Sequence, residues 1–223
     1  MRPGCPGEAL AGWVTRATLR CVEIVTEAGP ARVELDDAAS RRFLLVLTHG
    51  SGGGVDSADL LAARQAGLDL GGCVARVVQP YRMRGARAPG SAARQDAAWL
   101  EIIRVLRRRR RFASVPLIQG GRSNGARVAC RTAQAAGALA VLALAFPLHP
   151  PGRPDRSRAG ELYEAGPEVL VVNGSADPFG VPDPTGRVEV AVLPGATHAL
   201  GRQGGQIREV VEKWLAGLLA GTT

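Results

Sequence analysis

The chain has 223 residues, of which 46% are hydrophobic and 22% are charged. This composition excludes an intrinsically disordered chain, because its apolar surface can offset the entropy lost on folding, and the length fits one domain with a large core. The net charge of +8 comes almost entirely from arginine, since Lys213 is the only lysine. A basic balance bears on solubility and on anionic partners, but it does not determine a fold.

The first 20 residues are rich in glycine, proline and arginine and show no clean periodicity. We therefore expect a loose extension over residues 1–20 and a single domain over residues 21–223. The extension lacks the continuous apolar core of a signal peptide, and no stretch approaches the roughly 20 apolar residues that span a bilayer. Four cysteines lie far apart without metal-type spacing: Cys5, Cys21, Cys73 and Cys130. These features predict a cytoplasmic protein with no membrane span, no metal and no cofactor.

Two alternating segments, 21–26 and 31–35, flank turn residues 27–30 and predict an antiparallel hairpin. From residue 43 onwards, short runs of branched aliphatic residues alternate with longer helical segments. The predicted strands cover residues 43–48, 73–79, 115–119, 139–146, 169–173 and 188–193. The predicted helices cover residues 57–66, 92–110, 124–136 and 206–219. Strands without polar alternation suit burial on both faces, so the pattern predicts a doubly wound, mostly parallel α/β sheet flanked by helices.

The segment 147–158 holds four prolines and three arginines, a composition that predicts a loop. No other insertion is visible between the strands predicted at 139–146 and 169–173. We therefore expect no large lid in this domain.

The densest run of charge is 107–111, which ends the helix predicted at 92–110. One interpretation is a surface that neutralises the phosphates of nucleic acid or acidic lipid. The other is the solvated end of a surface helix, where cations complement the helix dipole. The second is favoured, and nucleic-acid binding is not expected, because no aromatic residues interleave with the run to stack on bases.

A serine flanked by glycines follows one of the predicted strands. The segment GRSNG at residues 121–125 comes after strand 115–119 and leads into helix 124–136. This is G-x-S-x-G in a strand-turn-helix context, where small neighbours permit the sharp turn that exposes a nucleophilic hydroxyl. The alternative is an ordinary Gly/Ser turn, but the placement favours Ser123 as a nucleophile.

A serine hydroxyl becomes a good nucleophile when a neighbouring base accepts its proton, and the usual base is histidine. Of the three histidines, His198 lies past the last predicted strand and completes the chain order Ser, Asp, His that accompanies this motif. His149 lies in the proline-rich loop, ahead of any acid candidate, and fits a structural or substrate-lining role better. His198 is therefore the predicted base.

An acid must orient the imidazole and stabilise the imidazolium. Asp177 lies in the loop after strand 169–173, twenty-one residues before His198, and is the predicted acid. Asp183 competes for this role, although its position between two prolines also fits a turn residue.

The glycine-rich segment 49–54 follows the strand predicted at 43–48 and offers backbone N–H groups to a developing oxyanion. We assign the two oxyanion donors to the amides of Ser51 and Asn124. A phosphate cradle is not expected here, because the segment lacks both a GK[ST] ending and GxGxxG spacing.

Together, these motifs resemble those of a small α/β-hydrolase-like family. That family includes the testis-expressed protein 30 and the hydrolase-like domain of a subunit of the non-specific lethal acetyltransferase complex. The matching motifs are HGSGG at 49–53, GGRSNG at 120–125, FPLHPPG at 146–152, GSADPFG at 174–180 and the late His198. FPLHPPG is the most specific of them, and Ala126 departs from the glycine that the family usually has there. The resemblance implies an α/β-hydrolase fold over about residues 22–220. Because some members of that family act as parts of assemblies, it also implies a possible protein partner.

The residues predict a serine acyl hydrolase, similar to esterases, thioesterases or peptidases, that acts on a small acyl substrate. In this hypothesis Ser123 attacks the carbonyl, and His198 transfers the proton. The candidates for lining the substrate site are Arg122, His149 and Phe179. A second hypothesis stays open: a hydrolase-fold module that binds a protein partner without turnover.

Overall fold

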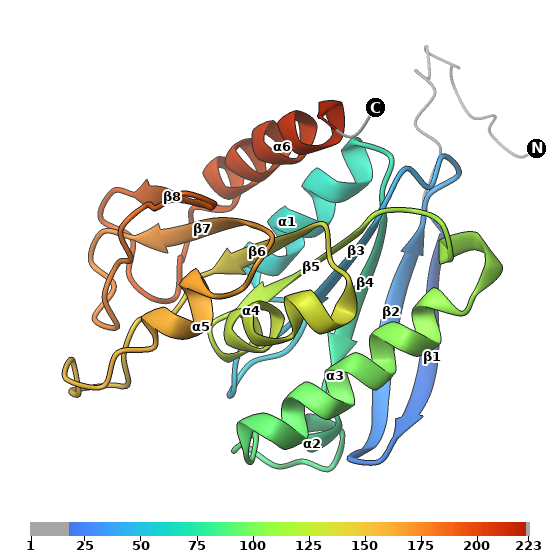
Figure 1. Cartoon of the computed structure of the whole chain (residues 1–223), viewed down its shortest axis with the longest axis horizontal. Helices are drawn as coiled ribbons and strands as arrows, with labels where there is room; N and C mark the ends of the chain where they lie inside the picture. Colours follow the sequence, from blue (N-terminus) through green and yellow to red (C-terminus); the bar gives the residue numbers. More distant parts are fainter. Residues whose placement is uncertain (1–17, 222–223) are drawn as a thin grey trace, which may run out of the picture.

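The structure of the protein is a computed structural model that describes residues 18–221. Most of the predicted extension, residues 1–17, lies outside the described residues. Within residues 18–221 the chain forms an eight-stranded sheet in the order β1-β2-β4-β3-β5-β6-β7-β8 (Figure 1). The strands are β1 (Thr18–Thr26), β2 (Gly29–Asp37), β3 (Leu44–Thr48), β4 (Cys73–Val78), β5 (Leu117–Arg122), β6 (Ala140–Leu144), β7 (Glu168–Gly174) and β8 (Val188–Leu193).

One end of the sheet is antiparallel and the rest is parallel. β1 and β2 form a hairpin in which Thr26 pairs with Gly29, and β2 also runs antiparallel to β4. The other neighbouring strands in the described part of the chain are parallel. The predicted hairpin and mostly parallel sheet are therefore confirmed, although β1 already begins at Thr18, inside the predicted extension.

Helices cover both faces of this sheet. They are α1 (Ala58–Asp69), α2 (Pro80–Met83), α3 (Ala92–Arg107), α4 (Asn124–Ala136), α5 (Ala159–Tyr163) and α6 (Gly204–Ala220), with a 3₁₀ turn η1 (Arg110–Phe112). α1 packs beside α6 on one face, while α3 packs beside α4 on the other (Figure 1). Leu60 and Trp214 belong to the apolar cluster of the first face, and Trp99 and Val128 to that of the second. Apolar burial on both faces explains why the strands carry branched aliphatic residues without polar alternation.

The main departure from the predicted elements concerns β5. The sequence predicts a strand at 115–119, whereas the observed strand runs to Arg122 and includes Gly120 and Gly121. Glycine usually weakens a strand, but here it permits close approach: a Cβ added at Gly120 would collide with the Leu142 carbonyl of the neighbouring strand. The short helices α2 and α5 are not predicted, because four or five residues carry too little periodicity to recognise.

Two arginines of the run 107–111 are bound to the chain around them. Arg107 donates hydrogen bonds to the carbonyls of Val115 and Ala113. Arg111 pairs with Asp37 at 2.6 Å and lies over the ring of Phe112. α3 ends at Arg107, so the run lies at and beyond the end of a helix shorter than the predicted 92–110, and at least Arg107 and Arg111 are engaged within the chain.

The segment 147–158 contains neither helix nor strand, which confirms the predicted loop. Between β6 and β7 the described chain adds only this loop and α5, so no large lid covers the carboxyl edge of the sheet. Among residues 18–221, none of the helices is both long enough and apolar enough to cross a membrane.

Candidate active site

Ser123 lies between β5 and α4 in a backbone conformation that residues other than glycine rarely adopt. Its φ is 53° and its ψ is −113°, outside the helical and extended regions. A Cβ added at Gly121 would lie 2.7 Å from the Thr48 carbonyl oxygen. One added at Gly125 would lie 2.7 Å from the carbonyl oxygens of both Thr48 and His49. The two glycines therefore let β3, β5 and α4 approach closely enough to form the sharp turn that presents the Ser123 hydroxyl.

A chain of hydrogen bonds connects Ser123 to the loops after β7 and β8. Ser123 Oγ lies 2.9 Å from His198 Nε2, and His198 Nδ1 lies 2.9 Å from Asp177 Oδ2. The buried Asp177 carboxylate also accepts the N–H of Phe179 through Oδ1, at 2.9 Å. The structure thus brings together the three side chains that the sequence singles out, from three separate loops at one edge of the sheet.

The partners of His198 determine where its protons can lie. A carboxylate only accepts hydrogen bonds, so the nitrogen facing Asp177, Nδ1, carries the proton in this arrangement. The lone pair of Nε2 then faces the hydroxyl of Ser123. This tautomer can accept the serine proton, while the carboxylate can stabilise the imidazolium that forms.

Both assigned oxyanion donors lie beside Ser123. Ser51 and Asn124 line the same cleft as the serine, and a Cβ added at Gly50 would lie 3.3 Å from Ser123 Cβ. Asn124 is the first residue of α4, where a backbone N–H has no acceptor within the helix. Its carboxamide is turned towards α3, where Nδ2 donates to Gln95 Oε1 at 2.6 Å. The backbone amides of Ser51 and Asn124 remain the predicted donors.

The loop that carries Ser51 is held by a buried histidine. The Gln79 N–H donates to His49 Nε2 at 3.0 Å, so Nε2 must be unprotonated and Nδ1 carries the proton that it donates to the Gly50 carbonyl, at 2.8 Å. Burial lowers the pKa of His49, which favours this neutral form. The Tyr81 hydroxyl donates to the Ser51 carbonyl at 3.2 Å. His49 is therefore a support of the glycine-rich loop rather than a second proton carrier.

Arg122 lines the cleft, but its charge is already neutralised. Its Nε lies 2.8 Å from the buried carboxylate of Asp59 in α1, and one of its terminal nitrogens donates to the His198 carbonyl at 3.0 Å. Because Arg122 directly precedes Ser123, these contacts connect the turn of Ser123 to α1 and to the loop that carries His198. Arg122 therefore lines the cleft and also forms a structural ion pair with Asp59.

The cleft around Ser123 has a volume of about 330 Å³. Phe179 lines it as predicted, with its ring centroid 4.2 Å from that of His198. His149 is not among the described residues that line it. The His149 N–H instead donates to the Phe179 carbonyl at 3.2 Å, and its ring packs against Gly180. These contacts brace the loop that carries Asp177 and fit the structural role that the sequence offers for His149, whereas its substrate-lining role stays a prediction.

A sequence model of the α/β hydrolase domain matches residues 41–205, a segment that contains all three side chains of the hydrogen-bonded chain. The chain belongs to the α/β hydrolase family. The predicted fold class is thereby confirmed. No curated protein sequence matches this chain.

Solved structures extend the likeness over nearly the whole chain of this α/β hydrolase. An α/β serine hydrolase without lid from Xanthomonas campestris has a TM-score of 0.71 at 20% identity, covering 92% of this chain and 95% of the other. An α/β serine hydrolase homologue from Coxiella burnetii has a TM-score of 0.73 at 15% identity, covering 92% and 100%. Est1E from Butyrivibrio proteoclasticus has a TM-score of 0.69 at 13% identity, covering 90% and 99%. At these identities the likeness establishes a shared fold.

Sequence reasoning missed one side chain that organises the acid loop of this α/β hydrolase. Asn173, buried at the end of β7, accepts the Phe146 N–H at 2.8 Å. Its Nδ2 donates to the Gly180 carbonyl at 3.2 Å and lies 3.4 Å from Asp177 Oδ2. A polar residue at the end of an otherwise apolar strand is the signal that could have revealed it.

Proposed function

We propose that this α/β hydrolase is a serine acyl hydrolase that cleaves a small ester, thioester or amide. The observation that carries the proposal is the continuous hydrogen-bonded chain from Ser123 Oγ through His198 to Asp177. In the proposed first step, Ser123 Oγ attacks the carbonyl carbon of the substrate while its proton passes to His198 Nε2. The amides of Ser51 and Asn124 donate hydrogen bonds to the oxyanion that develops on the carbonyl oxygen.

The tetrahedral intermediate then collapses and expels the alcohol, thiol or amine, which takes the proton from His198 Nε2. This leaves the acyl group esterified to Ser123. A water molecule attacks that ester, again giving its proton to His198, and the second collapse returns the proton to Ser123 and releases a carboxylic acid. Through both steps Asp177 holds the imidazole by Nδ1 and stabilises its positive charge.

The small substrate follows from the cleft and from the similar structures. The cleft holds about 330 Å³, within the range of small-molecule sites, and the Xanthomonas protein of the same fold is described as lacking a lid. Est1E has been solved with ferulic acid bound, so this fold accommodates a small carboxylic acid in that protein. These likenesses support the proposal at the level of substrate size.

Labelling with a fluorophosphonate tests the proposal, because this probe bonds to an activated serine. We expect the wild-type protein to be labelled, and Ser123→Ala and His198→Ala to lose labelling. Turnover of a p-nitrophenyl ester should fall by at least about a thousandfold in Ser123→Ala, since the nucleophile is removed.

Ser114→Ala is the matched control, because Ser114 is exposed and outside the cleft, and it should keep full labelling. Undiminished turnover in a folded Ser123→Ala variant would end the assignment. A folded wild type without labelling would favour the other hypothesis, a module that binds a partner without turnover, which the finer resemblance to the testis-expressed protein 30 family suggests.

A further inference from the structure

Among the described residues, three arginines line the cleft that contains Ser123: Arg122, Arg127 and Arg158. A guanidinium in a protein is charged at any ordinary pH, so each of them needs a counter-charge or water. Arg122 has its counter-charge in Asp59, at 2.8 Å. The remaining two differ sharply in their partners.

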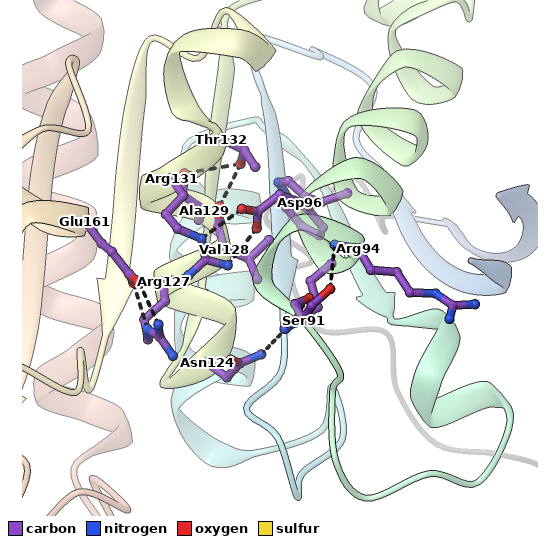
Figure 2. Close-up of polar contacts among 12 residues, drawn as sticks. Ser91, Arg94, Asp96, Asn124, Arg127, Val128, Ala129, Arg131, Thr132 and Glu161 are labelled. Atoms are coloured by element: carbon purple, nitrogen blue, oxygen red, sulfur yellow. Dashed lines mark hydrogen bonds and ion pairs between the residues drawn. The ribbon is translucent and has the colours of Figure 1, made fainter. Parts of the chain in front are cut away.

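Arg127 is neutralised by a bidentate ion pair. Its Nε and a terminal nitrogen donate to the two oxygens of Glu161, at 2.7 and 2.6 Å (Figure 2). The same carboxylate also accepts a hydrogen bond from Arg131, at 3.1 Å. Arg131 is paired with Asp96 as well, at 2.6 Å. Glu161 is thus shared between two arginines and has little capacity left for a third.

Arg158 is the cation without a partner. Within residues 18–221 its side chain makes no hydrogen bond and no ion pair, although it is half-buried at the cleft wall. Its backbone is held in place, because its N–H donates to the Leu148 carbonyl at 2.7 Å and its carbonyl accepts the Glu161 N–H at 3.0 Å. Burial, and after it the charge of Arg127, lower the pKa of Arg158, while the carboxylate of Glu161 acts in the opposite direction. The guanidinium is therefore anchored at its base, partly desolvated and next to an Arg127–Glu161 pair whose carboxylate is already engaged.

We propose that the substrate carries a carboxylate, separate from the bond that is cleaved, and that Arg158 binds this carboxylate. This inference rests on the proposed acyl hydrolase function and names its substrate class: a small ester or thioester with an anionic end. One unpaired guanidinium matches one carboxylate in charge and in bidentate geometry. A phosphate dianion carries a second negative charge, which Arg158 alone would leave without a counter-charge. Phosphate is therefore the alternative that the experiment must distinguish.

Two substrates that differ in a single carboxylate test this inference. The mono-p-nitrophenyl ester of adipic acid and p-nitrophenyl hexanoate share the leaving group and the length of the acyl chain. We expect the wild type to prefer the adipate ester in kcat/KM. Arg158→Gln should lower this preference by about ten- to a hundredfold, because a charged hydrogen-bonded pair in a partly buried site is lost. The hexanoate serves as the internal reference, because it lacks the carboxylate: the measured quantity is the ratio of the two kcat/KM values within each variant.

Arg156→Gln is the matched control, since Arg156 belongs to the same loop, carries the same charge and is exposed outside the cleft. It should leave the preference intact. Circular dichroism and the urea midpoint should be nearly unchanged in Arg158→Gln, because its side chain makes no hydrogen bond or ion pair within residues 18–221. An equal loss of preference in both variants would overturn the inference, since it would reflect overall charge.

Binding to a variant that cannot turn over separates this inference from the proposed function. In the Ser123→Ala background, calorimetry should detect monomethyl adipate but not dimethyl adipate, and adding Arg158→Gln should weaken the binding at least about tenfold. Tighter binding of inorganic phosphate than of monomethyl adipate would overturn the carboxylate assignment. Equal binding of the two adipate esters, or of neither, would also overturn it. If the wild type hydrolyses both p-nitrophenyl esters without preference, the hydrolase function stands and this inference fails; if it hydrolyses neither but binds monomethyl adipate through Arg158, the reverse holds.

Discussion

At the scale of single residues, the turn that presents Ser123 depends on a glycine, Gly125, at a position where a side chain would not fit. Gly125 has no side chain, and this permits α4 to begin directly against the end of β3, with the carbonyl oxygens of Thr48 and His49 only 2.7 Å from where a Cβ would lie. Those carbonyls belong to rigid backbone, so they cannot rotate away as a flexible side chain could. A methyl group at this position would therefore force α4 or β3 to shift.

We therefore expect Gly125→Ala to destabilise the protein by about 1–3 kcal/mol, as overpacking of a tight core contact does. Ester turnover should also fall, because the same shift displaces the turn that presents Ser123. Urea denaturation measures the first effect and turnover the second. Gly205→Ala is the control: Gly205 is exposed near the start of α6 with nothing within 4 Å of an added Cβ, so its stability should be unchanged or slightly raised. Equal effects of the two substitutions would contradict the close approach at Gly125.

At the scale of elements, a buried glutamine connects the central strand to two helices. Gln119 of β5 is fully buried, and its Oε1 accepts the indole N–H of Trp99 in α3 at 3.0 Å. Its Nε2 donates to the Ala129 carbonyl at 2.6 Å and to the Thr132 hydroxyl at 3.1 Å, both in α4. One side chain thus sets how α3 and α4 sit on the strand that leads to Ser123.

Replacing Gln119 with leucine should lower the free energy of unfolding by about 1–3 kcal/mol, because the buried indole N–H of Trp99 loses its acceptor. Trp99→Phe should be less harmful in the Gln119→Leu background than in the wild type, since it then removes an unsatisfied donor. Thermal or urea denaturation of the four proteins yields this coupling. Gln206→Leu, at an exposed position of α6, should change stability by less than about 0.5 kcal/mol. Strictly additive effects at Gln119 and Trp99 would mean that their hydrogen bond contributes nothing.

At the scale of the whole molecule, the layers of helix and sheet seal two of the thiols from solvent. Cys73 at the start of β4 and Cys130 in α4 are buried, whereas Cys21 on the edge strand β1 is exposed. Burial raises the pKa of Cys73 to about 11 and that of Cys130 to about 12. A thiol with a raised pKa holds very little thiolate at neutral pH, and the thiolate is the reactive species.

Iodoacetamide at neutral pH should therefore modify Cys21 roughly a hundredfold or more faster than Cys73 or Cys130 in the folded protein. Mass spectrometry of the resulting peptides follows each cysteine separately. In concentrated urea the rates should become similar, which is the control. Rapid modification of Cys73 in the folded state would indicate that the antiparallel end of the sheet opens readily.

Much of this architecture can be predicted from the sequence, because its signals are local. Runs of branched aliphatic residues identify strands buried on both faces, and helical periodicity identifies the long helices. Ser123, Asp177 and His198 can be singled out because each follows a strand, and the carboxyl ends of parallel strands lie at one edge of the sheet. The short helices α2 and α5 and the glycine-containing end of β5 escape prediction, since their signals are too brief or resemble a loop.

Charge and contact between distant segments were decided only by the tertiary structure. The sequence shows several arginines around the serine, but only the packing of α1 and α5 reveals that Asp59 neutralises Arg122 and that Glu161 neutralises Arg127, leaving Arg158 without a partner in the described chain. The contacts of His149 with Phe179 and Gly180, which connect its loop to the one that carries Asp177, are likewise not visible in the sequence. Pairing of side chains depends on distances through space between elements remote in the chain, and a linear pattern of residue types carries no such distances.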